Sequence, residues 1–186
     1  MTHFVCLLEE PSAKAMLEGV LPRILPSDVA PFFIVFEGKQ DLEKQMVMKI
    51  KGWQKPDSVF LVMRDQDASD CTALKNHLTR LRQQAKKQHV LVRIACKELE
   101  SFYFGDLSAV EKGLKIPNIA RQSKKAKYRV PDQIVNPSSE LEKLTQGHYQ
   151  HISGSRAIAP HLSISRNTSH SFNVLVTGIH RLLNRG

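Results

Sequence analysis

The sequence predicts an α/β protein with a mostly parallel, four-stranded sheet flanked by helices, and with a helical C-terminal extension. The five residues from Val59 to Met63 are all apolar, which is typical of a strand buried on both faces in a parallel sheet. Similar apolar segments alternate with amphipathic segments over the first two-thirds of the chain. This alternation of strand and helix favours parallel strands joined by helical crossovers.

Each element of this pattern has its own signal. Ser12 can cap a helix whose apolar face includes Leu17 and Leu21, and Pro26 ends it. Pro56 leads into the third strand. Strands are expected at 3–8, 32–36, 59–65 and 90–95, and helices from 12 to about 25, 40 to 52, 69 or 70 to about 87, and 97 to 104.

The last third of the chain has a different composition. Residues 115–137 contain three prolines and a basic cluster, which together predict an irregular surface segment. Ser138 opens a short helix, residues 148–168 read as a loop, and Ser171 caps a final amphipathic helix. We therefore expect one domain over 1–186, with a core of about 1–113 and an extension of about 114–186. The basic cluster is Arg121, Lys124, Lys125, Lys127 and Arg129.

Charge and composition narrow the class of protein. The 27 Lys and Arg residues outnumber the 18 Asp and Glu residues and give a net charge of +9, which suits a polyanion such as nucleic acid. No apolar run reaches the length of a membrane span, and the first residues lack the basic segment of a signal peptide. Cys6, Cys71 and Cys96 are widely spaced and suggest no disulfide framework. These features favour a cytoplasmic protein without a membrane partner.

Acidic residues follow two of the predicted strands. Asp65 and Asp67 end the third strand, and Glu9 and Glu10 follow the first. Parallel strands bring their carboxyl ends to one edge of the sheet, where α/β proteins bind ligands. Asp65 and Asp67 would point the same way if the extended conformation continued through them. Neighbouring carboxylates repel each other, and a hard divalent cation such as Mg²⁺ relieves that repulsion.

A glutamate after the first strand and an Asp-x-Asp after a later one resemble the Toprim pattern of topoisomerases, primases and overcoming-lysogenization-defect nucleases. Nearly the whole chain also resembles a family of small bacterial Toprim-like proteins that is classed as a domain of unknown function. The segments that carry this resemblance are Leu7-Leu-Glu-Glu-Pro-Ser12, Phe36-Glu-Gly-Lys-Gln-Asp-Leu42, Arg93-Ile-Ala-Cys-Lys-Glu-Leu-Glu-Ser-Phe-Tyr-Phe-Gly-Asp106 and Gly154-Ser-Arg-Ala-Ile-Ala-Pro-His161.

The resemblance implies a metal-dependent nuclease or phosphotransfer domain that uses Mg²⁺ or Mn²⁺ and acts on DNA or RNA. It also implies an AAA- or ABC-type ATPase partner and a role in phage defence. The Toprim glutamate falls on Glu9 and the aspartate pair on Asp65 and Asp67. Glu10 stands where a glycine commonly follows, which leaves open whether Glu9 or Glu10 faces the metal. The alternative is a non-catalytic subunit of an ATPase complex in which the acidic site is vestigial.

The chemistry suggests a role for each acid. Glu9 is the candidate general base or acid, and Asp65 and Asp67 are candidate catalytic metal ligands. Asp70 is either a further ligand or a helix cap. Glu98 and Glu100 either extend the acidic edge or occupy the first turn of a helix, where acids meet the helix dipole favourably.

Basic side chains are candidates for phosphate contact. Lys39 follows a glycine at a strand end and either contacts phosphate or is solvated. Arg156 and His161 lie in the last family-like segment and either contact phosphate or a partner, or belong to a docked structural loop. The basic cluster of residues 121–129 is either a nucleic-acid contact or a solvated surface.

Overall fold

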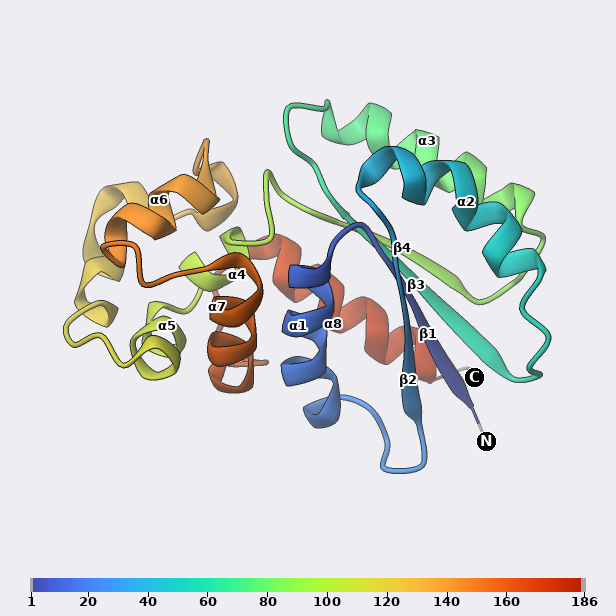
Figure 1. Ribbon diagram of the computed structural model, residues 1–186, viewed down its shortest axis with the longest axis horizontal. Coiled ribbons are helices and arrows are strands. Elements are labelled where there is room, and N and C mark those ends of the chain that lie inside the picture. Colours follow the sequence, from blue (N-terminus) through green and yellow to red (C-terminus); the bar gives the residue numbers. More distant parts are fainter. Residues whose placement is uncertain (1, 185–186) are drawn as a thin grey trace.

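The computed structural model describes residues 2–184, and its centre is a four-stranded parallel sheet of order β2-β1-β3-β4 (Figure 1). This confirms the predicted α/β class. The strands pair in register, with His3 of β1 opposite Ala30 of β2 and Ser58 of β3, and Phe60 of β3 opposite Val90 of β4. Their bounds are β1 (His3–Leu8), β2 (Ala30–Val35), β3 (Ser58–Asp65) and β4 (Val90–Ala95).

The strands are apolar on both faces because helices cover both faces. Along β1, Cys6 packs into the core beneath α1 (Pro11–Val20) and α8 (His170–Leu183), whereas Val5 packs into the core beneath α2 (Lys39–Lys51) and α3 (Cys71–Gln84). Figure 1 shows α2 and α3 on one side of the sheet and α1 and α8 on the other. The five apolar residues from Val59 to Met63 are thus fully enclosed.

The remaining helices form a lobe beside the sheet, beyond α1 (Figure 1). Short 3₁₀ turns connect them over residues 120–133, the segment predicted to be irregular. Helix α7 contacts α1 and α5, so the lobe packs tightly onto the sheet domain. The helices are α4 (Ser101–Phe104), α5 (Leu107–Leu114), α6 (Pro137–Leu144) and α7 (His151–Ile158).

Three differences between the predicted and the observed helices have a clear local cause. The first ends at Val20 and continues as a 3₁₀ turn over Leu21–Arg23, because Pro22 has no N–H for an α-helical hydrogen bond. The helix expected over 97–104 is only α4, because Lys97 adopts φ +62°, outside the helical region. The final helix is capped by Ser169, whose side chain accepts from the Phe172 N–H, and Ser171 lies inside it.

The prediction of a loop over 148–168 is wrong, because α7 and a 3₁₀ turn over Ala159–His161 lie within it. Small residues explain the error. A Cβ on Gly154 would lie 2.5 Å from the Tyr149 ring, and one on Gly19 of α1 would lie 2.7 Å from Ala159. Helices that approach this closely use glycine and alanine, which give no strong apolar periodicity.

Within residues 2–184, no helix has both the length and the apolarity needed to cross a bilayer.

Candidate functional site

The strand order places a switch point between β1 and β3. The chain leaves β1 toward β2 on one side and later leaves β3 toward β4 on the other. Open α/β sheets bind ligands in the crevice at the carboxyl ends of two such strands. Glu9 directly follows β1, and Asp65 ends β3.

Glu9 and Asp65 are in direct contact. The Glu9 N–H donates to the Met63 carbonyl at 3.3 Å, so the chain stays beside β3 beyond the end of β1. The Asp65 N–H in turn donates to Glu9 Oε2 at 3.0 Å. The parallel register thus brings together the two strand-end acids that the sequence pattern singled out. We call the acids at this edge the acidic rim: Glu9, Glu10, Asp65, Asp67, Glu98 and Glu100.

Asp65 is the acid of this rim on which burial and neighbouring like charges act most strongly. Burial raises the pKa of its carboxyl well above the ordinary value, and the negative charges of Glu10, Glu100 and Glu9 raise the pKa further. Its Oδ2 accepts a hydrogen bond from the Leu99 N–H at 3.1 Å, which offsets only part of this cost. The fold therefore holds a carboxylate where several like charges meet.

Asp67 does not continue the strand, so the extended conformation that would align it with Asp65 is absent. Its φ is +53°, and its N–H donates to the Lys97 carbonyl at 2.7 Å. Its carboxylate turns toward Lys39, with 2.7 Å between Asp67 Oδ2 and Lys39 Nζ. This places Lys39, a predicted phosphate contact, at the rim and beside a predicted metal ligand.

Arg64 is a buried cation among the acids and is only 4% exposed. Its guanidinium lies 3.9 Å from Glu9 Oε2 and 3.8 Å from Asp67 Oδ2, and it also pairs with Glu43 of α2. Burial raises the pKa of the Glu9 carboxyl, while the Asp65 N–H and the charge of Arg64 lower it. Arg64 therefore holds three carboxylates in fixed positions.

Glu98 and Glu100 lie in the loop that leads from β4 to α4. Glu100 is only 2% exposed, and its Oε1 accepts from the Tyr149 hydroxyl at 2.6 Å and pairs with His151 Nδ1 at 3.2 Å. The contact between His151 and Glu100 raises the pKa of His151. Glu98 Oε2 accepts from the Ser138 N–H at 2.7 Å, and burial raises its pKa. Glu100 is the N-cap residue of α4, but its side chain makes no capping hydrogen bond, and no acid lies in the first turn of this helix.

Glu10 occupies the N-cap position of α1, and its carboxylate accepts from the Ser12 hydroxyl. Its charge is among the causes that raise the pKa of both Asp65 and Glu9, so Glu10 lies close to both groups. The usual glycine position is thus filled by one more acid of the rim.

The other predicted site residues have separate surroundings. Asp70 is exposed and caps α3, with its Oδ1 accepting from the Ala73 N–H at 2.8 Å. Arg156 is exposed on α7, and His161 lines a cavity of about 220 Å³ with Lys112 and Arg166. Among the described residues, no hydrogen bond or ion pair joins any of the three to the acidic rim.

Three residues of the site were missed by sequence reasoning: Arg64, Tyr149 and His151. Arg64 carried a usable signal, because a lone arginine at the end of an apolar strand and before an acid pair needs a partner. Tyr149 and His151 come from α7 and the residues before it, a segment read as a loop, and no local pattern connects them with Glu100.

The donor set of the rim fits a hard cation. Carboxylate oxygens are the ligands that Mg²⁺ prefers, and the like charges around Asp65 are the condition that such an ion relieves. Within residues 2–184, no three His, Cys, Asp or Glu side chains are grouped closely enough to hold a metal ion in this conformation. Lys39 and Arg64 instead pair with Asp67.

The protein is thus an α/β domain with carboxylates at the switch point of its parallel sheet. The family model of a domain of unknown function (DUF4276) matches residues 8–180, so the chain belongs to this family. The C-terminal region of the Burkholderia pseudomallei OLD protein has a similar structure, with a TM-score of 0.52 and 15% sequence identity. That match covers 95% of this chain and 96% of that chain, and it shows a shared fold. The curated proteins include no match to the chain.

Proposed function

We propose that the protein is a Toprim-like, Mg²⁺- or Mn²⁺-dependent nuclease or phosphotransfer domain that acts on DNA or RNA. The observation that carries this proposal is the crowding of Glu9, Glu10 and Glu100 around the partly buried Asp65 at the switch point. A fold tolerates such repulsion when a bound cation offsets it.

In this proposal, Glu9, Asp65 and Asp67 hold the metal. When bound, the ion supplies charge neutralisation at the phosphate and a more acidic bound water. Glu9 is the candidate general base or acid, because burial holds its pKa above the usual range. Arg64 positions Glu9 and Asp67. Lys39 now pairs with Asp67, and in the proposed complex its ammonium group contacts a phosphate oxygen instead.

The proposal includes nucleic acid as substrate and an AAA- or ABC-type ATPase as partner, in phage defence. The net charge of +9 supports the first part. The family resemblance supports the second.

A second candidate function is favoured by one observation. Lys39 and Arg64 already neutralise part of the acidic charge, and residues 2–184 hold no ready-made metal site. A non-catalytic subunit of an ATPase complex would keep such a rim as an internally compensated structure.

Metal binding and cleavage separate the two functions. A nuclease should bind Mn²⁺ in calorimetry, gain thermal stability with it, and cleave nucleic acid with Mg²⁺ or Mn²⁺ but not with EDTA. Asp65→Asn with Asp67→Asn should abolish all three responses. Asp28→Asn is the matched control, because Asp28 is exposed in the turn before β2, at the opposite end of the strands. No heat and no thermal shift with the native chain would contradict the metal site and favour the non-catalytic subunit.

A further inference from the structure

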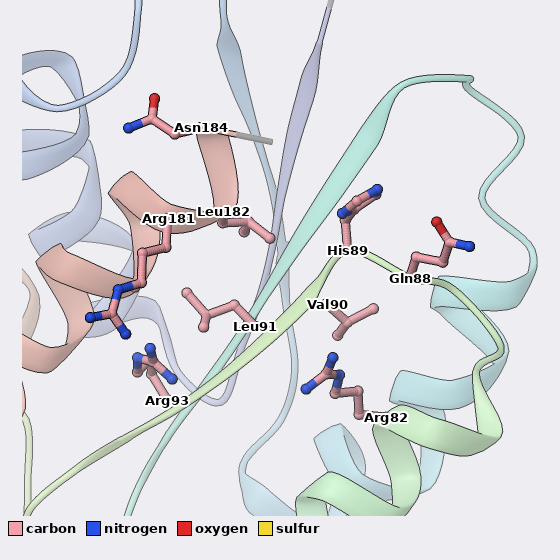
Figure 2. A pocket seen from close by; sticks show the side chains of 10 residues that line it. Arg82, Gln88, His89, Val90, Leu91, Arg93, Arg181, Leu182 and Asn184 are labelled. Atoms are coloured by element: carbon pink, nitrogen blue, oxygen red, sulfur yellow. The ribbon is translucent and has the colours of Figure 1, made fainter. Parts of the chain in front are cut away.

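A groove runs along the β4 edge of the sheet, between α3 and α8. One cavity of about 560 Å³ is lined by residues of α3, β4 and α8, and Figure 2 shows Arg93 and Arg181 side by side, with Arg82 across the β4 ribbon. A second cavity of about 300 Å³ shares Arg93, Gly178 and Arg181 with the first and continues along α8 to His170. We call the two cavities together the β4 groove.

The groove carries positive charge that the described part of the chain does not neutralise. No Asp or Glu lines either cavity, and Arg82, Arg93 and Arg181 make no salt bridge within residues 2–184. Burial and the neighbouring charge of Arg181 both lower the pKa of Arg93. Two guanidinium groups held this close are stabilised by an anion between them.

Arg93 is held in a fixed position. Its Nε donates to the Val174 carbonyl at 3.0 Å and its Nη1 to the Val92 carbonyl at 2.8 Å. A Cβ on Gly178 would lie only 2.2 Å from Arg93 Nη2, so the glycine makes room for the guanidinium against α8. A preorganised arginine loses little conformational entropy on binding an anion.

The groove leads to the acidic rim. Helix α8 has 14 residues and therefore extends for about 21 Å, with Arg181 in its last turn and His170 in its first. Next to His170, the Ser171 hydroxyl accepts from the Cys96 N–H at 3.4 Å. Lys97 follows, and its carbonyl accepts from the Asp67 N–H.

We propose that the β4 groove binds the phosphodiester backbone of nucleic acid and guides it toward the acidic rim. The proposal that the groove binds nucleic acid depends only on the groove itself. The proposal that it guides the backbone to the rim rests on the proposed nuclease function. The rim repels phosphate, and its cations Lys39 and Arg64 already contact carboxylates. A polyanion therefore needs other cations, and the groove supplies arginines from α3, β4 and α8 without a carboxylate beside them.

The test measures binding without cleavage, in EDTA, with fluorescein-labelled 20-nucleotide DNA and RNA, each single- and double-stranded. Arg82→Gln with Arg181→Gln should weaken binding about tenfold and reduce the slope of log affinity against log salt by about 1 to 2. This pair leaves Arg93 and its two backbone contacts in place. Lys49→Gln with Lys51→Gln on exposed positions of α2 removes the same charge and should change affinity less than twofold.

A second variant changes the position of Arg93 without removing any charge from the groove. Gly178→Ala should displace the Arg93 guanidinium and weaken binding about threefold, while the thermal midpoint of unfolding reports whether the fold is kept. The four probes show whether DNA or RNA, single- or double-stranded, is preferred. The proposal would be overturned if the groove variant and the α2 variant lost the same affinity for nucleic acid. It would also be overturned if the native chain bound polyglutamate as tightly as it binds nucleic acid.

The outcomes also separate the groove from the nuclease function. If Asp65→Asn with Asp67→Asn binds normally and the native chain never cleaves, the groove proposal stands and the nuclease proposal fails. If groove variants bind and cleave like the native chain, the groove proposal fails and the nuclease proposal stands.

Discussion

The acidic rim and the β4 groove both concentrate charge of one sign, but they differ in how that charge is compensated. In the rim, Arg64 and Lys39 lie among the acids and partly neutralise them. In the groove, the described residues place no carboxylate beside the arginines. The comparison indicates that internal cations compensate the rim in part and leave the crowding around Asp65 for a bound cation to relieve, whereas the groove depends on a ligand for all of its counter-charge.

The largest expected effect follows from neutralising the rim. Asp65→Asn with Asp67→Asn should reduce metal-dependent cleavage by about 100-fold or more, since both proposed ligands lose their charge. Affinity for nucleic acid should stay equal or rise, because negative charge near the path is removed. Gel assays measure the cleavage, and fluorescence anisotropy measures the affinity for nucleic acid, on the same protein preparation. A parallel loss of binding would show that rim and groove are not separate sites.

The next effect concerns the internal counter-charge of the rim. Arg64→Met should destabilise the fold by about 3 kcal/mol, because Glu9, Glu43 and Asp67 lose a buried partner. Urea unfolding measures this change. Arg82→Met, which breaks no ion pair in residues 2–184, should cost less than about 0.5 kcal/mol. If the two variants lost similar free energy of unfolding, Arg64 would not be the internal counter-charge of the rim, and the difference between rim and groove would disappear.

A third effect depends on pH. The pKa values of Asp65 and Glu9 are raised in the folded state, so this state binds protons more tightly than the unfolded chain does. In EDTA, stability should therefore fall as pH rises from the ordinary carboxyl range through the raised pKa values. Protonated His151 contributes in the same direction, because its pKa is also raised.

Thermal melts from pH 5 to 8 measure this dependence, and Mg²⁺ should raise the melting temperature more at pH 8 than at pH 5. Asp65→Asn should flatten the pH dependence in EDTA and raise the melting temperature at pH 8 by about 3 °C. A native chain that gains stability toward pH 8 in EDTA would refute the assignment of raised pKa values.

The smallest effect tests where the rim ends. Asp70→Ala should cost about 1 kcal/mol through loss of the α3 cap and leave the Mg²⁺-induced thermal shift unchanged. If the shift disappears instead, Asp70 is a metal ligand and the rim extends into α3.

The sequence predicted the sheet and the meeting of Glu9 with Asp65, because both follow from rules of parallel sheets. Five consecutive apolar residues require cover on both faces, and strand ends of equal direction share one edge. The left-handed conformation of Asp67 was not predictable in this way. It depends on its hydrogen bond to Lys97 and on its contact with Lys39, which join residues distant in the chain.

The lobe could not be predicted for a related reason. Gly154 packs against the Tyr149 ring and Ala159 against Gly19, so their segment has little apolar periodicity although it contains a helix and a 3₁₀ turn. The β4 groove was missed too, because Arg82, Arg93 and Arg181 come from three separate elements and meet only after α8 has packed against β4.

The hydrogen bond from Arg93 to the Val92 carbonyl has a consequence for solubility. β4 is an edge strand, and the Val92 carbonyl also accepts from Lys75 Nζ at 2.7 Å. Two cations on one outward carbonyl make the edge unsuitable for pairing with a strand of another molecule. Substituting Arg93 and Lys75 together would expose the apolar residues of β4 to such pairing, and the protein would then tend to aggregate edge to edge.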